Sequence, residues 1–207
     1  MLQDAGSRLG YGGFLELWSS VSAEFDTEAE RTLREFSMSE LGRVFFSRAV
    51  PGGFSDEQLG RFLETYLEEW NQGVRVIPGL ADLLARLAAD FRLAVITNTH
   101  DAALVPTHLE EMGVAGLFEA VVTSVEHGLR KPHPAIFEHA MSRLGAEAGQ
   151  CLHVGDDAVA DYRGALGAGL RALLIDPTGD SGVPEPSRLT SILQLESRLA
   201  SGGGGAW

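Results

Sequence analysis

The sequence has one cysteine, no long apolar run and a shortage of positive charge. Cys151 has no partner for an internal disulfide, which fits a reducing compartment. No apolar run approaches the roughly 18 residues needed to span a bilayer. The first residues show no basic region followed by an apolar stretch, as a signal peptide would. We therefore expect a cytoplasmic protein that has no membrane partner.

Positive charge is scarce, because 16 Lys and Arg residues face 29 Asp and Glu residues, for a net charge of −13. Such a chain repels nucleic acid and anionic membranes, so we expect no nucleic-acid partner. A small anion can bind only where local cations or a metal ion overcome this field. The plainer alternative is that the charge serves solubility alone.

The composition supports a folded chain of one or two domains, since 44% of the 207 residues are hydrophobic and 22% are charged. Residues 1–74 read as helices. Ser55 and Gln58 fit a capping box, and apolar residues recur at helical spacing from Leu59 to Trp70. Phe14 and Trp18 repeat at the same spacing, which favours the core of this unit over a pocket lining.

From residue 75 to 200, short apolar runs alternate with helical stretches. The runs at 93–97, 120–123, 151–154 and 171–175 predict strands, and helices are predicted over 134–144, 158–168 and 189–199. This alternation predicts an α/β fold, a parallel sheet with helices on both faces. Right-handed crossovers place the carboxyl ends of all strands at one edge, where ligands bind. Residues 201–207 are rich in glycine and predict a flexible tail.

Two polar clusters follow predicted strands or precede helices. Thr97 and Asn98 end the first strand, where a hydroxyl and free backbone amides suit a phosphate oxygen, although Thr-Asn is also ordinary turn chemistry. Lys131 lies between Arg130 and Pro132, just ahead of the helix that begins at Pro134. An ammonium held there can neutralise a phosphate or a carboxylate, whereas most lysines are simply solvated.

The third cluster is acidic and follows the strand at 151–154. Asp156, Asp157 and Asp161 bring three carboxylates together within six positions, and these repel one another unless a cation binds. Oxygen ligands without cysteine or paired histidines suit Mg²⁺ rather than zinc. Alternatively, Asp156 or Asp157 caps the next helix.

The order of these motifs resembles the haloacid-dehalogenase (HAD) superfamily, in the subfamily with a helical cap inserted between the first and second core motifs. The resemblance implies a Rossmann-like core over 75–200 and a cap over 1–74. It implies that Thr97, with Asn98 beside it, binds a phosphoryl oxygen. It also implies that Lys131 offsets the negative charge of the nucleophile and the phosphate, and that Asp156 and Asp161 bind Mg²⁺. Asp157 is the weaker ligand candidate. His133 stands where the family often has aspartate, and would cap a helix.

The family's first motif, an apolar strand ending in D-x-D-x-T that supplies the nucleophile, has no counterpart in the sequence. Asp4 and Asp26 follow no apolar strand, and Asp176 comes after the fourth motif instead of before the cap. The sequence therefore reads as starting just after this motif. The family's first strand lies between those expected at 93–97 and 151–154, so these either close up or leave two open edges.

Three functions stay open at this stage. The resemblance favours a Mg²⁺-dependent phosphatase that acts on a small phosphorylated metabolite through an aspartyl-phosphate, once the first motif is supplied. A metal-free haloacid dehalogenase is the second, although that branch has S-x-N where Gly155, Asp156 and Asp157 stand. The third is a binding or regulatory module without a nucleophile. The oligomeric state is left open.

Overall fold

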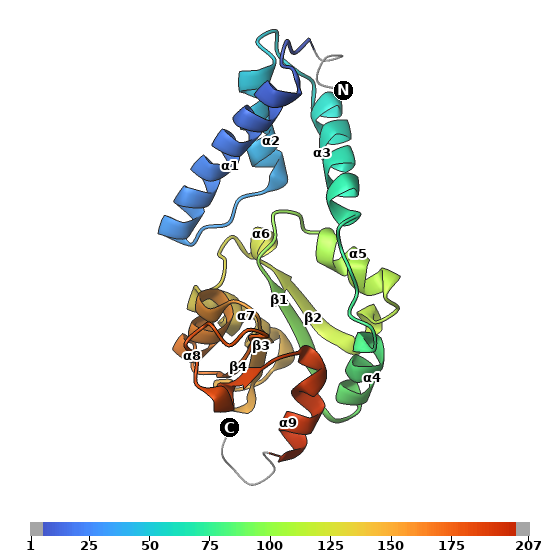
Figure 1. The fold of residues 1–207 in the computed structure, drawn as a ribbon, viewed down its shortest axis with the longest axis vertical. Coiled ribbons are helices and arrows are strands. Elements are labelled where there is room, and N and C mark those ends of the chain that lie inside the picture. The colour runs from blue at the N-terminus through green and yellow to red at the C-terminus, as the bar shows by residue number, and fades with distance from the viewer. Residues whose placement is uncertain (1–5, 202–207) are drawn as a thin grey trace. The chain divides into compact units, whose positions relative to one another are not determined.

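The structure is a computed structural model, and it describes residues 6–201. The chain divides into two compact units, Met1–Arg75 and Val76–Trp207. Figure 1 shows helices in the first unit, and strands with helices around them in the second. None of the described helices is both long enough and apolar enough to cross a bilayer.

The described residues of the first unit form three helices: α1 (Tyr11–Thr32), α2 (Met38–Ala49) and α3 (Asp56–Asn71). Two of them begin at capping boxes. The Ser55 hydroxyl accepts from the Gln58 amide while the Gln58 side chain accepts from the Ser55 amide, as the sequence predicted. Ser37 and Glu40 form the same pair at the start of α2. These caps satisfy backbone donors that the first turn of a helix leaves free.

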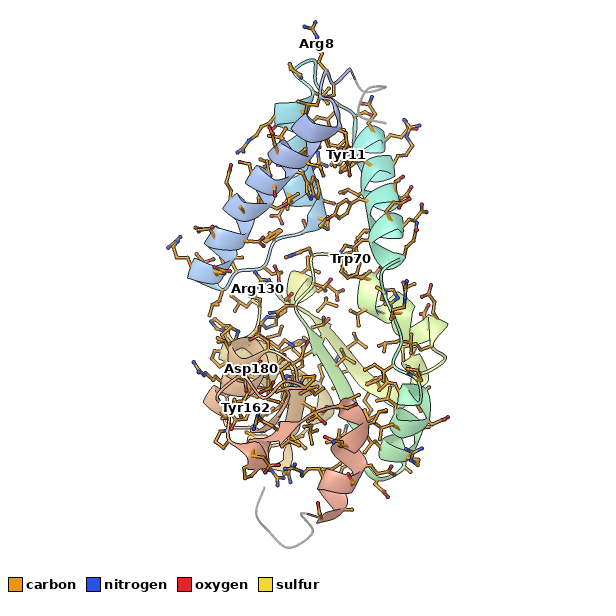
Figure 2. All side chains as sticks on the ribbon, viewed as in Figure 1. Arg8, Tyr11, Trp70, Arg130, Tyr162 and Asp180 are labelled. Atoms are coloured by element: carbon orange, nitrogen blue, oxygen red, sulfur yellow. The ribbon has the colours of Figure 1, made fainter. Side chains whose placement is uncertain are left out.

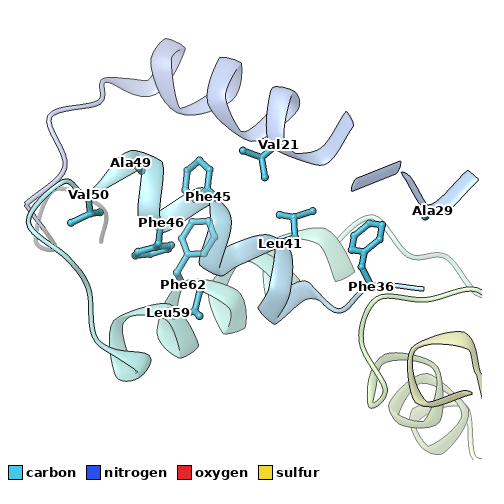
Figure 3. Close-up of a cluster of buried hydrophobic side chains, with 10 residues drawn as sticks. All are labelled: Val21, Ala29, Phe36, Leu41, Phe45, Phe46, Ala49, Val50, Leu59 and Phe62. Atoms are coloured by element: carbon cyan, nitrogen blue, oxygen red, sulfur yellow. The ribbon is translucent and has the colours of Figure 1, made fainter. Parts of the chain in front are cut away.

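A cluster of buried apolar side chains joins the three helices, and Figure 3 shows it. Phe14 and Trp18 pack against this cluster, which confirms them as core residues of the unit. Gly42 lets α2 and α3 approach, because a Cβ there would lie 2.8 Å from Leu59 Cδ1. The cluster consists of Val21, Ala29, Phe36, Leu41, Phe45, Phe46, Ala49, Val50, Leu59 and Phe62.

The second unit alternates strands and helices, as the sequence pattern predicted. Its strands are β1 (Leu93–Thr97), β2 (Phe118–Thr123), β3 (Leu152–Gly155), β4 (Arg171–Ile175) and the short β5 (Arg188–Leu189). Its helices are α4 (Leu80–Asp90), α5 (Leu104–Glu111), α6 (Ser124–His127), α7 (Pro134–Leu144), α8 (Gly164–Gly167) and α9 (Leu195–Ser201). A π-helical turn, η3 (Ala158–Arg163), joins β3 to α8.

The strands form two parallel sheets instead of one. β1 pairs with β2, and β4 pairs with β3 on one side and β5 on the other. Within residues 6–201, no ladder joins β1 to β3. Without the family's first strand, we expected the strands at 93–97 and 151–154 either to close up or to leave two open edges. The structure has the two open edges. Figure 1 shows β1 beside β2 and β3 beside β4.

Helices cover both faces of these sheets, which confirms the α/β architecture. Adjacent β4 residues point to opposite sides: Ala172 packs into a cluster with α7, whereas Leu173 packs into a cluster with α4 and α9. Alternating side chains of one strand thus enter two separate cores. The ion pair between Arg86 Nε and Glu196 Oε1, at 3.0 Å, joins α4 to α9 on the second side.

The end of the chain differs from the prediction of a helix over 189–199. Residues 188–189 form β5, a 3₁₀ turn covers Ile192–Gln194, and α9 begins only at Leu195. A two-residue strand has no periodicity that sequence could reveal. Ser201 belongs to α9 and not to the predicted tail. Residues 202–207 lie outside the described residues, and so do residues 1–5, which include Asp4.

Candidate active site

A cavity of about 940 Å³ separates β1 from β3. All five residues of β1 and all four of β3 line it, together with apolar side chains of α4, α7 and α9. Within the described range 6–201, the strands that line it are hydrogen-bonded only to their outer neighbours, β2 and β4. The cavity is therefore a slot between two strand edges, and most of the residues that line it are apolar.

The carboxyl end of this slot is polar. Thr97, Lys131, Asp156 and Asp161 all line it, as their positions after parallel strands led us to expect. Arg130 and Tyr162, both labelled in Figure 2, mark the two segments that carry Lys131 and Asp161. The sequence-predicted residues thus come from three separate segments and meet at one end of one cavity.

Lys131 is the only lysine among the 207 residues, and it is buried. Its side chain is 10% exposed, and its ammonium donates to Asp161 Oδ1 at 2.5 Å and to the Ile96 carbonyl at 3.0 Å. It therefore links β1 to the turn that follows β3. An ammonium has three protons, so one remains for a ligand at this end of the slot. The solvated-lysine interpretation is wrong for this residue.

Asn98 holds the Lys131 backbone in place. Its side-chain amide donates to the Lys131 carbonyl at 3.0 Å, and its side-chain oxygen accepts from the Lys131 amide at 2.8 Å. This reciprocal pair joins the end of β1 to the segment before α7. The Asn98 side chain is thus occupied in positioning Lys131, and a direct contact to substrate stays a prediction.

Asp161 is the most enclosed carboxylate of the site, at 5% exposure. Oδ1 accepts from Lys131 and from His153 Nε2, the latter at 2.8 Å, and Oδ2 accepts from the Asp157 amide at 3.0 Å. Burial by itself raises the pKa of Asp161, but the hydrogen bond from His153 and the charge of Lys131 outweigh it and hold the pKa well below its usual range. Asp161 is therefore ionised and balances the charge of Lys131.

Asp156 and Asp157 differ sharply although they are neighbours. Asp157 Oδ1 accepts from the amides of Val159 and Ala160, each at 2.7 Å, so it caps η3. Asp156 is exposed, and within residues 6–201 its carboxylate has no hydrogen bond or ion pair. The capping alternative therefore applies to Asp157, and Asp156 is left free for a cation.

The donor set of the site fits Mg²⁺ in chemistry. Mg²⁺ commonly takes one or two carboxylates, completes its shell with water and substrate phosphate, and needs no all-protein cage. Asp156 offers a free carboxylate, and Asp161 a second one that is already hydrogen-bonded. Among the described residues, no group of three or more His, Cys, Asp or Glu side chains could by itself hold a metal ion. A metal here would depend on ligands beyond these two aspartates.

The other aspartates considered for the nucleophile lie elsewhere. Asp26 is an exposed residue within α1. Asp176 is 8% exposed and accepts from the Gly179 amide and from the amide and hydroxyl of Ser181, so it stabilises the loop after β4. Neither lies at the carboxyl end of the slot. Among the described residues, the carboxyl end of the slot therefore holds the ion pair of Lys131 and Asp161 together with Asp156, which follows β3.

His153 is the site residue that sequence reasoning missed. It lies in β3, is 11% exposed, and contacts Asp161 directly. The spacing of the histidines in the sequence gives no metal-binding motif and so does not single out His153. A polar residue inside a short apolar strand was the signal that could have pointed to it.

The chain is also similar to known proteins in sequence and in fold. Residues 17–169 match the family described as haloacid dehalogenase-like hydrolase. The chain belongs to that family. The sequence resemblance to the HAD superfamily is thereby confirmed, and so is the α/β fold.

Several relatives of this HAD-like hydrolase are phosphatases. It is 34% identical over 134 residues to 5-amino-6-(5-phospho-D-ribitylamino)uracil phosphatase YigB of Escherichia coli, a match of 64% of this chain and 53% of that protein. It is 31% identical over 194 residues to ribulose-1,5-bisphosphate 5-phosphatase of Halopiger xanaduensis, a match of 86% of this chain and 81% of that protein. The HAD-like hydrolase spans about half the length of YigB.

A solved structure points to the other chemistry found in the family. The 2-haloacid dehalogenase of Pseudomonas syringae superposes on the HAD-like hydrolase with a TM-score of 0.72 at 28% identity, covering 93% of this chain and 82% of that one. Relatives of the chain thus include proteins named as phosphatases and one named as a 2-haloacid dehalogenase. The choice between phosphatase and dehalogenase chemistry therefore depends on the residues of the site.

Proposed function

We propose that the chain is the larger part of a Mg²⁺-dependent phosphatase that acts on a small phosphate ester. The single observation that carries this proposal is the buried pair of Lys131 and Asp161 at the carboxyl end of the slot, with free Asp156 beside it. A fixed ammonium and a free carboxylate at a strand edge suit a phosphoryl group and its metal. The phosphatase relatives support the same reaction class.

The nucleophile belongs, in this proposal, to an extended segment that fills the slot. The slot is flanked by β1 and β3, which are five and four residues long, so a strand of about five residues fits between them. Pairing with both edges would satisfy backbone groups that the slot leaves open. A parallel strand ending in D-x-D-x-T would place its first aspartate beside Lys131. We propose that such a segment lies upstream of Met1 in a longer form of the protein.

The chemistry follows the family's two steps. The first aspartate attacks phosphorus, the bond from phosphorus to the ester oxygen breaks, and the second aspartate gives its proton to the leaving alkoxide. Water, deprotonated by that second aspartate, then attacks phosphorus, releases phosphate and frees the first aspartate. Lys131 donates its third N–H to the phosphoryl oxygens or the nucleophile, and the Thr97 hydroxyl donates to a phosphoryl oxygen. Asp156, together with Asp161, would hold Mg²⁺, which when bound would supply positive charge to the phosphoryl group.

The metal-free dehalogenase is the second candidate, because the Pseudomonas syringae structure is that of a 2-haloacid dehalogenase. The acidic cluster argues against it. An exposed carboxylate without a partner, such as Asp156, repels a second carboxylate, and a haloacid substrate carries one. Removing Mg²⁺ with a chelator separates the two, since a dehalogenase would keep its turnover.

A binding or regulatory module without a nucleophile is the third candidate. Its support is that the family's first motif, an apolar strand ending in D-x-D-x-T, has no counterpart in the sequence. A chain that is lengthened by an apolar strand ending in D-x-D-x-T, and that still hydrolyses nothing, would favour this candidate.

The substrate and setting are proposed at the level of class. The printed names of the phosphatase relatives point to phosphorylated small metabolites, so we propose a substrate of that kind. The single cysteine supports a reducing compartment, and we propose the cytoplasm.

The test of this function is hydrolysis of p-nitrophenyl phosphate with Mg²⁺ by the lengthened chain and its Lys131 variants. Lys131→Ala is expected to lower kcat about a hundredfold or more, as for other charge-stabilising groups at a reacting centre. It also leaves Asp161 charged and buried, so a loss of stability is expected. Lys131→Arg keeps the positive charge but replaces the compact ammonium with a planar guanidinium group, so it should also lose turnover.

Arg143→Ala, on the exposed side of α7, is the matched control and should keep full turnover. Heat denaturation of each variant separates lost folding from lost catalysis. Near-normal turnover in a folded Lys131→Ala variant would contradict the proposed role of Lys131.

A further inference from the structure

One oxygen of Asp161 receives hydrogen bonds from two donors. His153 Nε2 lies 2.8 Å from Oδ1, and Lys131 Nζ lies 2.5 Å from the same atom. The other oxygen accepts from the Asp157 amide. Three donors from three segments thus hold a single carboxylate, and only one of them, Lys131, belongs to a long flexible side chain.

The contact defines which ring nitrogen of His153 carries a proton. Asp161 is ionised beside Lys131, and a carboxylate only accepts hydrogen bonds. His153 must therefore donate from Nε2. A 5.2 Å edge-to-face contact with Phe137, which is fully buried, orients the imidazole ring. His153 is accordingly a donor held on a strand and braced by the core.

Lys131 needs such a fixed acceptor if it is to act at one point. Its four-carbon side chain has many rotamers, and an acid that could turn would let the ammonium follow it. Because His153 and the Asp157 amide hold both oxygens of Asp161, the ammonium meets a fixed Oδ1 and a fixed Ile96 carbonyl. These two contacts leave its third N–H in a defined direction.

We propose that His153 is a positioning residue, whose Nε2–H fixes Asp161 and thereby aims the ammonium of Lys131 into the carboxyl end of the slot. Its relevance to turnover rests on the proposed phosphatase function, while the contact itself does not. Supporting donors behind a reacting group typically change activity about 10- to 100-fold when they are lost.

The single lysine makes the proposal directly measurable. The 207-residue chain labelled with ¹⁵N-lysine gives one side-chain ammonium signal in NMR, and this signal belongs to Lys131. Spectra are recorded in solutions dilute enough that the chain is monomeric. We expect a slowly exchanging, sharp ammonium signal that reports the fixed contacts of Lys131.

Three replacements of His153 separate the donor from the packing. His153→Phe keeps an aromatic ring against Phe137 but removes the donor, and the sharp signal should be lost or shifted. His153→Gln places an amide nitrogen near the position of Nε2 and should restore the signal. His153→Asn carries the same amide one carbon shorter and should not restore it. His108→Gln, on α5, is the control and should leave the signal unchanged.

A wild-type signal in a folded His153→Phe variant would overturn the proposal, as would a folded His153→Gln variant that fails to restore the signal. Circular dichroism establishes folding for each variant. In the lengthened, active chain, His153→Phe should lower kcat about 10- to 100-fold with KM nearly unchanged, and His153→Gln should recover most of it. An unchanged kcat for His153→Phe would also overturn the proposal. Absence of any turnover in the lengthened parent would instead count against the phosphatase function, and the NMR comparison would still decide the role of His153.

Discussion

The three carboxylates after β3 have three different surroundings, although six positions contain them all. Asp157 caps a turn through two backbone amides, Asp161 is buried in an ion pair, and Asp156 is exposed and unpaired within residues 6–201. A cation can bind Asp156 without breaking a hydrogen bond or an ion pair that the carboxylate already makes. This difference in surroundings, rather than charge alone, separates the metal ligand from the helix cap.

Mg²⁺ binding should therefore depend on Asp156 much more than on Asp157. Asp156→Asn removes the free negative charge and is expected to abolish binding. Asp157→Asn keeps the cap, because asparagine caps as well as aspartate, and should weaken binding only through lost charge. Calorimetric titration of both variants with MgCl₂ checks this, and equal or greater loss in Asp157→Asn would refute the assignment.

Gly155 is required because Asp161 occupies the space beside it. A Cβ at position 155 would lie 2.6 Å from Asp161 Cβ and 2.5 Å from its Oδ2. Gly155→Ala should thus displace Asp161 and lower the free energy of unfolding by about 1–3 kcal/mol, as is usual for overpacking. Gly167→Ala, in α8, meets nothing within 4 Å and is the matched control. Denaturant unfolding of both variants tests this, and equal stability of the two would contradict the packing described here.

At the scale of elements, α7 begins at an unusual cap. His133 Nδ1 accepts from the Ala135 amide at 3.2 Å, ahead of Pro134 at the first helical position. The expectation that His133 caps a helix is thereby confirmed. A neutral imidazole is a weaker partner for the helix N-terminus than a carboxylate, because the helix dipole favours negative charge there.

His133→Asp should consequently stabilise the second unit by about 0.3–1 kcal/mol. The same change at His108, in the last turn of α5, places negative charge at the wrong end of a helix and should destabilise. Melting temperatures of the two variants give the comparison. A lower melting temperature for His133→Asp than for the parent would show that His133 has another role.

Sequence predicted the elements of the second unit well where the signal was long or continuous. The strands at 93–97 and 171–175 have the expected bounds, and α7 begins at the expected proline. The predicted helix over 158–168 is split into η3 and α8, because the Asp157 carbonyl accepts from the Tyr162 amide as well as from the Asp161 amide and so widens the first turn. The predicted helix over 189–199 is wrong at its start, because β5 is too short to show an alternating pattern.

For the site, sequence could bring Thr97, Lys131 and Asp161 to one edge, because the carboxyl ends of parallel strands meet there. It could not give the reciprocal pair of Asn98 with the Lys131 backbone, nor the contact of His153 with Asp161. The first contact joins side chain and backbone 33 positions apart, and the second joins a strand to the turn that follows it, 8 positions on. Both depend on side-chain rotamers. Such contacts leave no regular spacing in a sequence.

At the scale of the whole molecule, the slot between β1 and β3 is the feature that links stability to function. In the part of the chain that the structure describes, β1 and β3 each have an edge without a strand partner, and such edges invite pairing with other chains. Backbone groups left buried without partners cost about 1–3 kcal/mol each, against a net stability of about 5–15 kcal/mol for a typical protein. We therefore expect the 207-residue chain to be marginally stable or prone to aggregate, and a strand in the slot to raise solubility and activity together.

The most direct measurement is hydrolysis of p-nitrophenyl phosphate with Mg²⁺ by the 207-residue chain and by the chain lengthened with an apolar strand ending in D-x-D-x-T. A lengthened chain whose first motif aspartate is replaced by asparagine is the control, because it fills the slot without a nucleophile. We expect turnover from the lengthened chain alone, lost with chelator and in Asp156→Ala, and improved solubility in both lengthened chains. Metal-dependent turnover by a monodisperse 207-residue chain, abolished by Asp156→Ala, would contradict this account by showing that the nucleophile is already present.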